Sequence, residues 1–142
     1  MSMALRHAIV CIGTVLALHG APVRAAEPAV EVFTLSTLPV TNARDATVYC
    51  LDALALLEQH LSLSLPPDPA RAQQMVTQRM AALGPELASR TQAGATGLAR
   101  IAQLGLQRAP AIVFDGTWAV YGITDVDVAR QLFARIAPAH GR

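Results

Sequence analysis

The chain has 142 residues, of which 53% are hydrophobic and 15% are charged, and its formal net charge is +1. This length suits a single domain. All 11 basic residues are arginines, and they form no basic patch interleaved with aromatic residues, so the sequence lacks the usual signature of a direct nucleic-acid binder.

The first 25 residues have the three-part pattern of a secretory signal peptide. A short basic start that ends at His7 precedes the apolar run 8–18, and small residues follow up to Ala26. The apolar run is too short to span a bilayer, and the alternative is a buried N-terminal helix. We expect cleavage near Ala25 or Ala26, export to the periplasm, and one mature domain over 26–142 with no transmembrane segment.

Export leaves a single cysteine. Cys11 lies in the predicted signal peptide, so Cys50 has no intramolecular partner for a disulfide in the mature chain. The predicted leader also holds two arginines, and without them nine arginines face ten carboxylates, a net charge of −1.

Two strands are predicted in the first part of the mature chain. The segment 30–34 alternates polar and apolar residues and is rich in β-branched and aromatic side chains. The segment 35–46 has loop chemistry, with room for one helical turn that begins at Pro39. A second strand follows over 47–51, and Asp52 is placed to cap the next helix.

A helical segment is predicted over about 53–107. Leucines have helical spacing from residue 53 to residue 61, and Asp68 followed by Pro69 is typical of the start of a second helix. Gly84 and Pro85 separate that helix from a third over 86–106, which we expect the Gly94–Gly97 region to loosen.

A Pro–strand–turn–strand unit follows the helices. Pro110 precedes the apolar run 111–114, Asp115-Gly116 is a turn signal, and 117–121 forms the return strand. A last helix begins after Thr124 or Asp125. Two parallel strands, an antiparallel hairpin and helices packed on the sheet together predict an α/β fold.

This order resembles the thioredoxin fold, in particular that of the periplasmic disulfide isomerases. The strand 32–34 resembles the one that leads into that family's C-x-x-C motif, and 109–116 resembles its cis-proline loop. The resemblance implies a cis Ala109–Pro110 bond. The motif would fall at Leu38-Pro39-Val40-Thr41, which contains no cysteine, so redox activity is not implied.

A second resemblance covers essentially the whole mature chain. The ordered motifs at 30–34, 48–52, 65–69, 109–115 and 121–125 are similar to those of small exported, thioredoxin-like proteins of unknown function encoded in integrating conjugative elements. That family is linked to a conjugative apparatus related to type IV secretion. The resemblance implies a role in conjugation through protein partners in the cell envelope, and it implies no catalytic activity.

The candidate contact surface is a groove beside the proline. We expect it to be lined by Leu38, Pro39, Val40, Thr41, Ala109, Pro110, Trp118 and Tyr121. Trp118 and Tyr121 lie three residues apart and should point to opposite faces of a regular strand, one toward the core and the other toward solvent. Both can instead be core residues.

Cys50 is a candidate free thiol. It is either a buried strand residue or a reactive group, and no lysine or histidine adjoins it to lower its pKa. No catalytic, cofactor or metal site is expected, since His60 and His140 are scattered and no turn motif supports a Ser36–His60–Asp52 triad. The sequence predicts a non-catalytic binding protein, and the alternative is a periplasmic thiol-disulfide oxidoreductase or a chaperone-like protein that uses Cys50.

Overall fold

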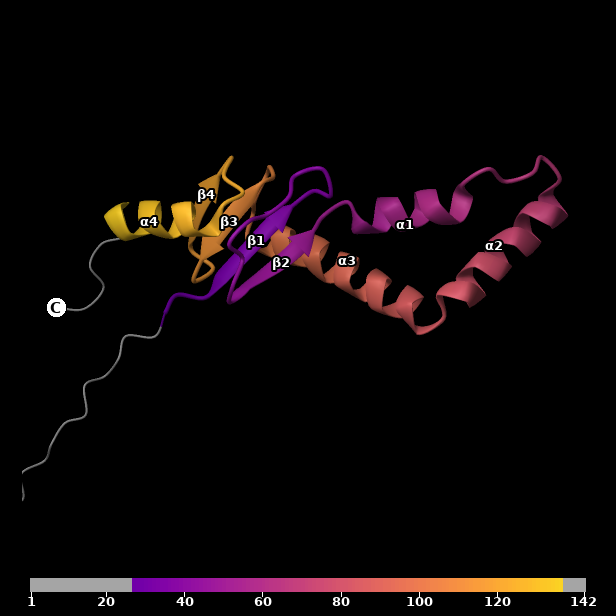
Figure 1. Ribbon diagram of the computed structural model, residues 1–142, viewed down its shortest axis with the longest axis horizontal. Coiled ribbons are helices and arrows are strands. Elements are labelled where there is room, and N and C mark those ends of the chain that lie inside the picture. The colour runs from indigo at the N-terminus through magenta and orange to yellow at the C-terminus, as the bar shows by residue number, and fades with distance from the viewer. Residues whose placement is uncertain (1–26, 137–142) are drawn as a thin grey trace, which may run out of the picture.

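The computed structural model describes residues 27–136, and its centre is a sheet of four strands. The strands are β1 (Val30–Thr34), β2 (Ala46–Cys50), β3 (Ala111–Phe114) and β4 (Trp118–Tyr121), in the order β2-β1-β3-β4 (Figure 1). β1 runs parallel to β2, and β3 runs antiparallel to both β1 and β4. The predicted mixed α/β class is therefore confirmed, with β2 one residue earlier than expected and β4 one residue shorter.

Each face of the sheet carries its own apolar core, because successive strand residues point to opposite sides. Helix α4 (Val126–Ile136) packs on the face formed by Val30, Val32, Ile112 and Phe114. Residues 101–106, at the end of helix α3 (Pro85–Gln103), pack on the other face, which is formed by Phe33, Ala111 and Val113. Burial of each large apolar side chain contributes about 1.5–3 kcal/mol, so these strands are the stable centre of the domain.

The predicted helical segment projects from the sheet as a helical arm, residues 53–103. Figure 1 shows α1 (Ala53–Ser62) leading away from the sheet, α2 (Pro69–Leu83) turning back, and α3 returning to it. Asp68 caps α2 by accepting a hydrogen bond from the Arg71 backbone N–H at 2.8 Å, and Pro69 occupies the first helical position, as predicted. No residue of α2 is buried, and Leu57 is the one buried residue of α1, so the arm is held mainly by α3.

The glycines of α3 do not loosen the helix, contrary to the expectation. α3 is continuous across Gly94 and Gly97, and both are buried. A Cβ atom at Gly94 would lie 2.8 Å from the Leu54 Cγ atom, and one at Gly97 would lie 3.1 Å from the Tyr49 Cβ atom. The glycines therefore let α3 approach α1 and β2 closely.

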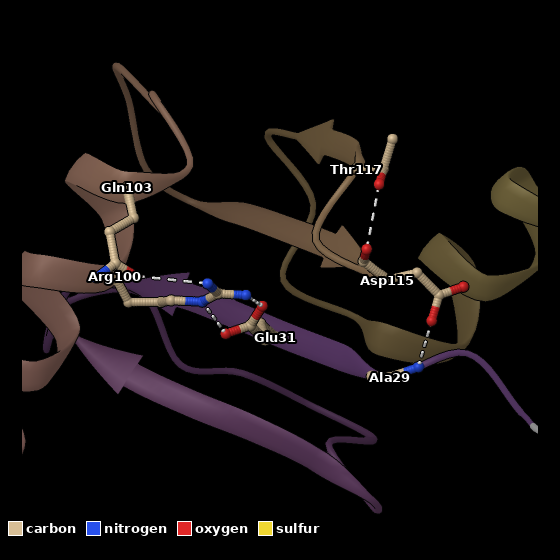
Figure 2. A network of polar contacts seen from close by, with 6 residues as sticks. All are labelled: Ala29, Glu31, Arg100, Gln103, Asp115 and Thr117. Atoms are coloured by element: carbon tan, nitrogen blue, oxygen red, sulfur yellow. Dashed lines mark hydrogen bonds and ion pairs between the residues drawn. The ribbon is translucent and has the colours of Figure 1, made fainter.

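Two polar contacts fix the start of β1 (Figure 2). The Glu31 carboxylate accepts two hydrogen bonds of 2.7 Å from the Arg100 guanidinium on α3. Asp115 in the β3–β4 turn accepts a 2.9 Å hydrogen bond from the Ala29 backbone N–H. The turn residues Asp115 and Gly116 have φ values of 50° and 64°, which suits the tight hairpin turn predicted for them.

Between residues 27 and 136, no helix is both long enough and apolar enough to cross a membrane. The predicted signal peptide and His140 lie outside these residues.

Candidate functional site

The strand register places Cys50, Pro110 and Tyr121 at one end of the sheet. Thr34 pairs with Cys50, Phe33 pairs with Ala111, and Ala111 pairs with Tyr121. Pro110, the residue before Ala111, therefore lies at the end of the sheet that carries the carboxyl ends of β1, β2 and β4. We call this region the Pro110 end of the sheet.

The Ala109–Pro110 bond is cis, as expected from the resemblance. The Pro110 carbonyl accepts a 3.0 Å hydrogen bond from the Gly122 backbone N–H, which ties the segment before β3 to the end of β4. Both Ala109 and Pro110 are half-buried.

The loop after β1 is held at its two ends. The buried Thr34 hydroxyl donates to the Leu38 carbonyl at 2.7 Å, and the Thr41 backbone exchanges hydrogen bonds with Thr124 and Val126 at 3.0 and 3.1 Å. Pro39, between these anchors, is exposed and begins no helical turn, contrary to the expectation. Of the four candidate groove residues in this loop, Leu38 and Val40 are half-buried, whereas Pro39 and Thr41 are exposed.

Asp125 holds the far end of this loop against the start of α4. Its carboxylate accepts hydrogen bonds from the Thr41 hydroxyl and the Asn42 amide, and also from the backbone N–H groups of Asp127 and Val128. These donors, above all Val128, hold the pKa of Asp125 below its usual value. Asp125 therefore acts as the predicted helix cap and, in addition, as an anchor for the loop.

Trp118 and Tyr121 point to opposite faces of β4, as predicted. Trp118 pairs with Phe114 near the hairpin turn and is half-buried. Its ring makes an edge contact with the Phe133 ring of α4, with the ring centroids 6.5 Å apart. Tyr121 lies at the Pro110 end and is 36% exposed. Tyr121 therefore lies at the same end of the sheet as Ala109 and Pro110, whereas Trp118 lies at the turn end of the hairpin and packs, like Val40, on the face covered by α4.

Arg108 joins Tyr121 at this end of the sheet. The centre of its guanidinium lies 4.8 Å from the centre of the Tyr121 ring, a cation–π arrangement. Gly105 and Gln107 line an open hollow with these two side chains. Arg108 makes no ion pair with a carboxylate of residues 27–136. Its guanidinium is therefore an unpaired positive charge that lies over the Tyr121 ring. No role is predicted for Arg108 from the sequence, where its position two residues before Pro110 is the available signal.

The Cys50 thiol is joined to a carboxylate. It donates to an Asp52 oxygen at 2.9 Å, while the Ser36 hydroxyl donates to the other oxygen at 2.6 Å. The Ser36 backbone N–H also donates to both oxygens, at 3.0 and 3.2 Å. Asp52 stands at the start of α1, but its side chain does not cap the helix as expected, because it is engaged by Ser36 and Cys50.

This arrangement disfavours a thiolate. Burial and the hydrogen bond to Asp52 raise the pKa of Cys50, while the donors Cys50 and Ser36 lower the pKa of Asp52 to about 2. The thiol therefore stays protonated near neutral pH, and the thiolate is the nucleophilic form. His60 is exposed on α1 and forms no hydrogen bond with Ser36 or Asp52, so the described residues assemble no triad and no group of metal ligands.

A protein-family model described as "Protein of unknown function (DUF1525)" matches residues 27–137. No curated protein matches the chain. No solved structure matches it either.

Proposed function

We propose that this chain, which belongs to the DUF1525 family, is a non-catalytic, exported component of an integrating conjugative element that assists DNA transfer by binding envelope proteins. Its scaffold in this proposal is thioredoxin-like. A parallel strand pair, an antiparallel hairpin and a cis proline directly before the third strand support that assignment.

The observation that carries the proposal is the chemistry of the Pro110 end of the sheet. Thiol–disulfide exchange needs a nucleophilic thiolate and a second thiol within reach. Cys50 is the one cysteine among residues 27–136, and its thiol is bonded to the Asp52 carboxylate, which opposes ionisation. This end of the sheet is therefore better suited to binding than to redox chemistry.

The exposed groups around Pro110 indicate what kind of segment would bind. Arg108 offers its guanidinium to a carboxylate, and the Tyr121 ring offers apolar surface at the same end of the sheet as Pro110. Arginine and tyrosine are frequent anchors of protein interfaces. The partner would therefore present an extended segment that combines an acidic side chain with an apolar one.

The decisive experiment measures transfer of the element after deletion of the gene. Transfer should fall at least tenfold, and the unmodified gene should restore it. An Arg108→Ala, Tyr121→Ala variant should not restore transfer, whereas Arg135→Ala, which removes an exposed arginine of α4, should restore it fully. Undiminished transfer on deletion would remove the conjugation role, and full rescue by the double variant would remove the contact surface.

The second candidate function is that of a thiol-disulfide oxidoreductase or a chaperone-like protein that uses Cys50. The position of Cys50 at the Pro110 end of the sheet, where it pairs with Thr34, favours it. An insulin-reduction assay with a Cys50→Ser control separates the two functions. Activity that depends on Cys50 would overturn the binding proposal, and equal inactivity of both proteins would discard the redox alternative.

A further inference from the structure

β4, the strand that carries Tyr121, lies at an edge of the sheet. Within residues 27–136, no strand pairs with its outer side. Edge strands usually carry a charge, a proline or a bulge that prevents pairing with another chain. The sequence of β4 is Trp-Ala-Val-Tyr, which holds no charge and no proline. The edge beside Tyr121 therefore lacks these two forms of protection.

The hydrogen bonds to β3 determine which backbone groups of β4 point outward. The Gly122 N–H donates to the Pro110 carbonyl at 3.0 Å, so residue 122 is bonded toward β3. In an antiparallel pair, residues that bond to the neighbouring strand alternate with residues that do not. The N–H and carbonyl groups of Ala119 and Tyr121 therefore point toward the open edge.

The side chains of the same two residues lie on a part of the sheet that α3 leaves uncovered. Tyr121 pairs with Ala111 and Ala119 pairs with Val113, so both lie on the face that α3 approaches. Ala111 and Val113 are buried on this face, whereas Ala119 is exposed and Tyr121 is 36% exposed. The open backbone groups and the exposed side chains of β4 thus belong to the same two residues.

We propose that the partner adds an extended, acidic segment to the sheet as a fifth strand, antiparallel to β4. Its main chain exchanges hydrogen bonds with Ala119 and Tyr121. Directly opposed residues share a face, with Cβ atoms about 4.5–5.5 Å apart. The residue opposite Tyr121 therefore lies beside the ring over which Arg108 is placed, 4.8 Å from guanidinium to ring centre. Because the charge of Arg108 is unpaired among residues 27–136, this position selects a glutamate or an aspartate.

This mode of binding rests on the proposed function, in which Arg108 and Tyr121 contact the envelope partner. It adds the backbone of β4 to that contact. A contact made by side chains alone would use Arg108 and Tyr121 without the main chain of Ala119. Methylation of peptide nitrogens separates the two modes, since it removes N–H donors and leaves every side chain in place.

The first test uses the synthetic peptide Thr-Val-Thr-Glu-Thr-Val-Thr at up to roughly 5 mM, where a contact of millimolar affinity is mostly saturated. With its glutamate opposite Tyr121, its second valine stands opposite Ala119. N-methylation of these two peptide residues should weaken binding about tenfold or more, as the loss of two hydrogen bonds implies. N-methylation of the two threonines beside the glutamate is the matched control and should have little effect, because their N–H groups point away from β4.

NMR spectroscopy measures this binding, and the Ala119 and Tyr121 amides should become protected from hydrogen exchange in the complex. Absence of binding, or equal weakening by both methylation patterns, would overturn strand addition. Retained dependence on Arg108 without any effect of methylation would remove the strand and leave the side-chain contact. Rescue of element transfer by the Arg108→Ala, Tyr121→Ala variant would instead remove the contact surface itself.

The second test reads the position of the acid. Arg108→Glu should weaken binding of the glutamate peptide and strengthen binding of the same peptide with lysine in place of glutamate. Arg135→Glu, which makes the same change at an exposed position of α4, should leave both affinities unchanged. Equal affinity of the unmodified chain for the glutamate and lysine peptides would contradict selection by Arg108.

Discussion

Substitution of Gly97 by alanine sets two known effects against each other at the contact between α3 and the sheet. An alanine in a helix interior is about 1 kcal/mol more favourable than a glycine. Its Cβ atom, however, would lie 3.1 Å from the Tyr49 Cβ atom and 3.4 Å from the Tyr49 Cδ1 atom. Carbon atoms in favourable contact are about 3.5–4.0 Å apart, so Tyr49 or the helix must move by a few tenths of an ångström.

Tyr49 has little freedom to move. Its ring stacks on the buried Phe33 ring with the centroids 5.0 Å apart, and its Cβ atom is fixed by the backbone of β2. Overpacking of this kind costs about 1–3 kcal/mol. The steric cost therefore exceeds the helix-propensity gain, and Gly97→Ala should lower the free energy of unfolding by about 1 kcal/mol, or the melting temperature by about 4 °C.

Urea denaturation followed by circular dichroism measures this change. Ala95→Gly, at an exposed position of the same helix, gives the helix-propensity effect alone. Gly94→Ala should also destabilise the chain, and an added Leu54→Ala should cost less in that variant than in the unmodified chain, because it removes the side chain that the new Cβ meets. If Gly97→Ala stabilises the chain by as much as Ala95→Gly destabilises it, α3 does not pack on β2 as described.

Three further predictions concern ionisable groups. Arg100 lowers the pKa of Glu31 below its ordinary 4.5, so the pair's contribution to stability is present above that pH and is lost as the pH falls through the folded-state pKa. Arg100→Met should therefore lower the free energy of unfolding at pH 7. In acid, the free energies of unfolding of the variant and the unmodified chain should become equal, as measured by denaturation between neutral and acidic pH. Asp52→Asn should lower the pKa of Cys50 and speed its alkylation by iodoacetamide at pH 8, since a nearby carboxylate opposes thiolate formation. Asp125→Ala should lower the melting temperature, because it removes the cap of α4 and both side-chain contacts to the loop after β1.

Matched variants serve as controls for these predictions. Arg90→Met removes an exposed arginine of α3 and should have little effect at any pH. Ser36→Ala keeps the carboxylate beside Cys50 and should not speed alkylation as Asp52→Asn does. Asp127→Ala lies beside Asp125 but makes no such side-chain contacts, so an equal loss of stability in both variants would contradict the anchoring role of Asp125.

The elements of the fold could be predicted because their signals are local. The alternation of β1, the Asp68–Pro69 start of α2 and the Asp115–Gly116 turn each reflect the conformational preferences of a few adjacent residues. The prediction that the Gly94–Gly97 region loosens α3 is wrong for the same reason. A glycine weakens a helix when only its neighbours in the sequence are considered. Whether it also allows close packing depends on β2 and α1, which lie far away in the sequence.

The candidate site was predictable only in part, because its contacts join distant segments. The position of Pro110 followed from its own strand, whereas the pairing of Cys50 with Asp52 and Ser36 depends on how β1 and β2 end side by side. The predicted hairpin itself places Trp118 beside the Asp115–Gly116 turn and Tyr121 at the other end of the return strand, so the predicted strand bounds already separate Trp118 from Pro110. The projection of the helical arm from the sheet could not be predicted either. Apolar spacing shows that a helix has an apolar face, but it does not show what covers that face.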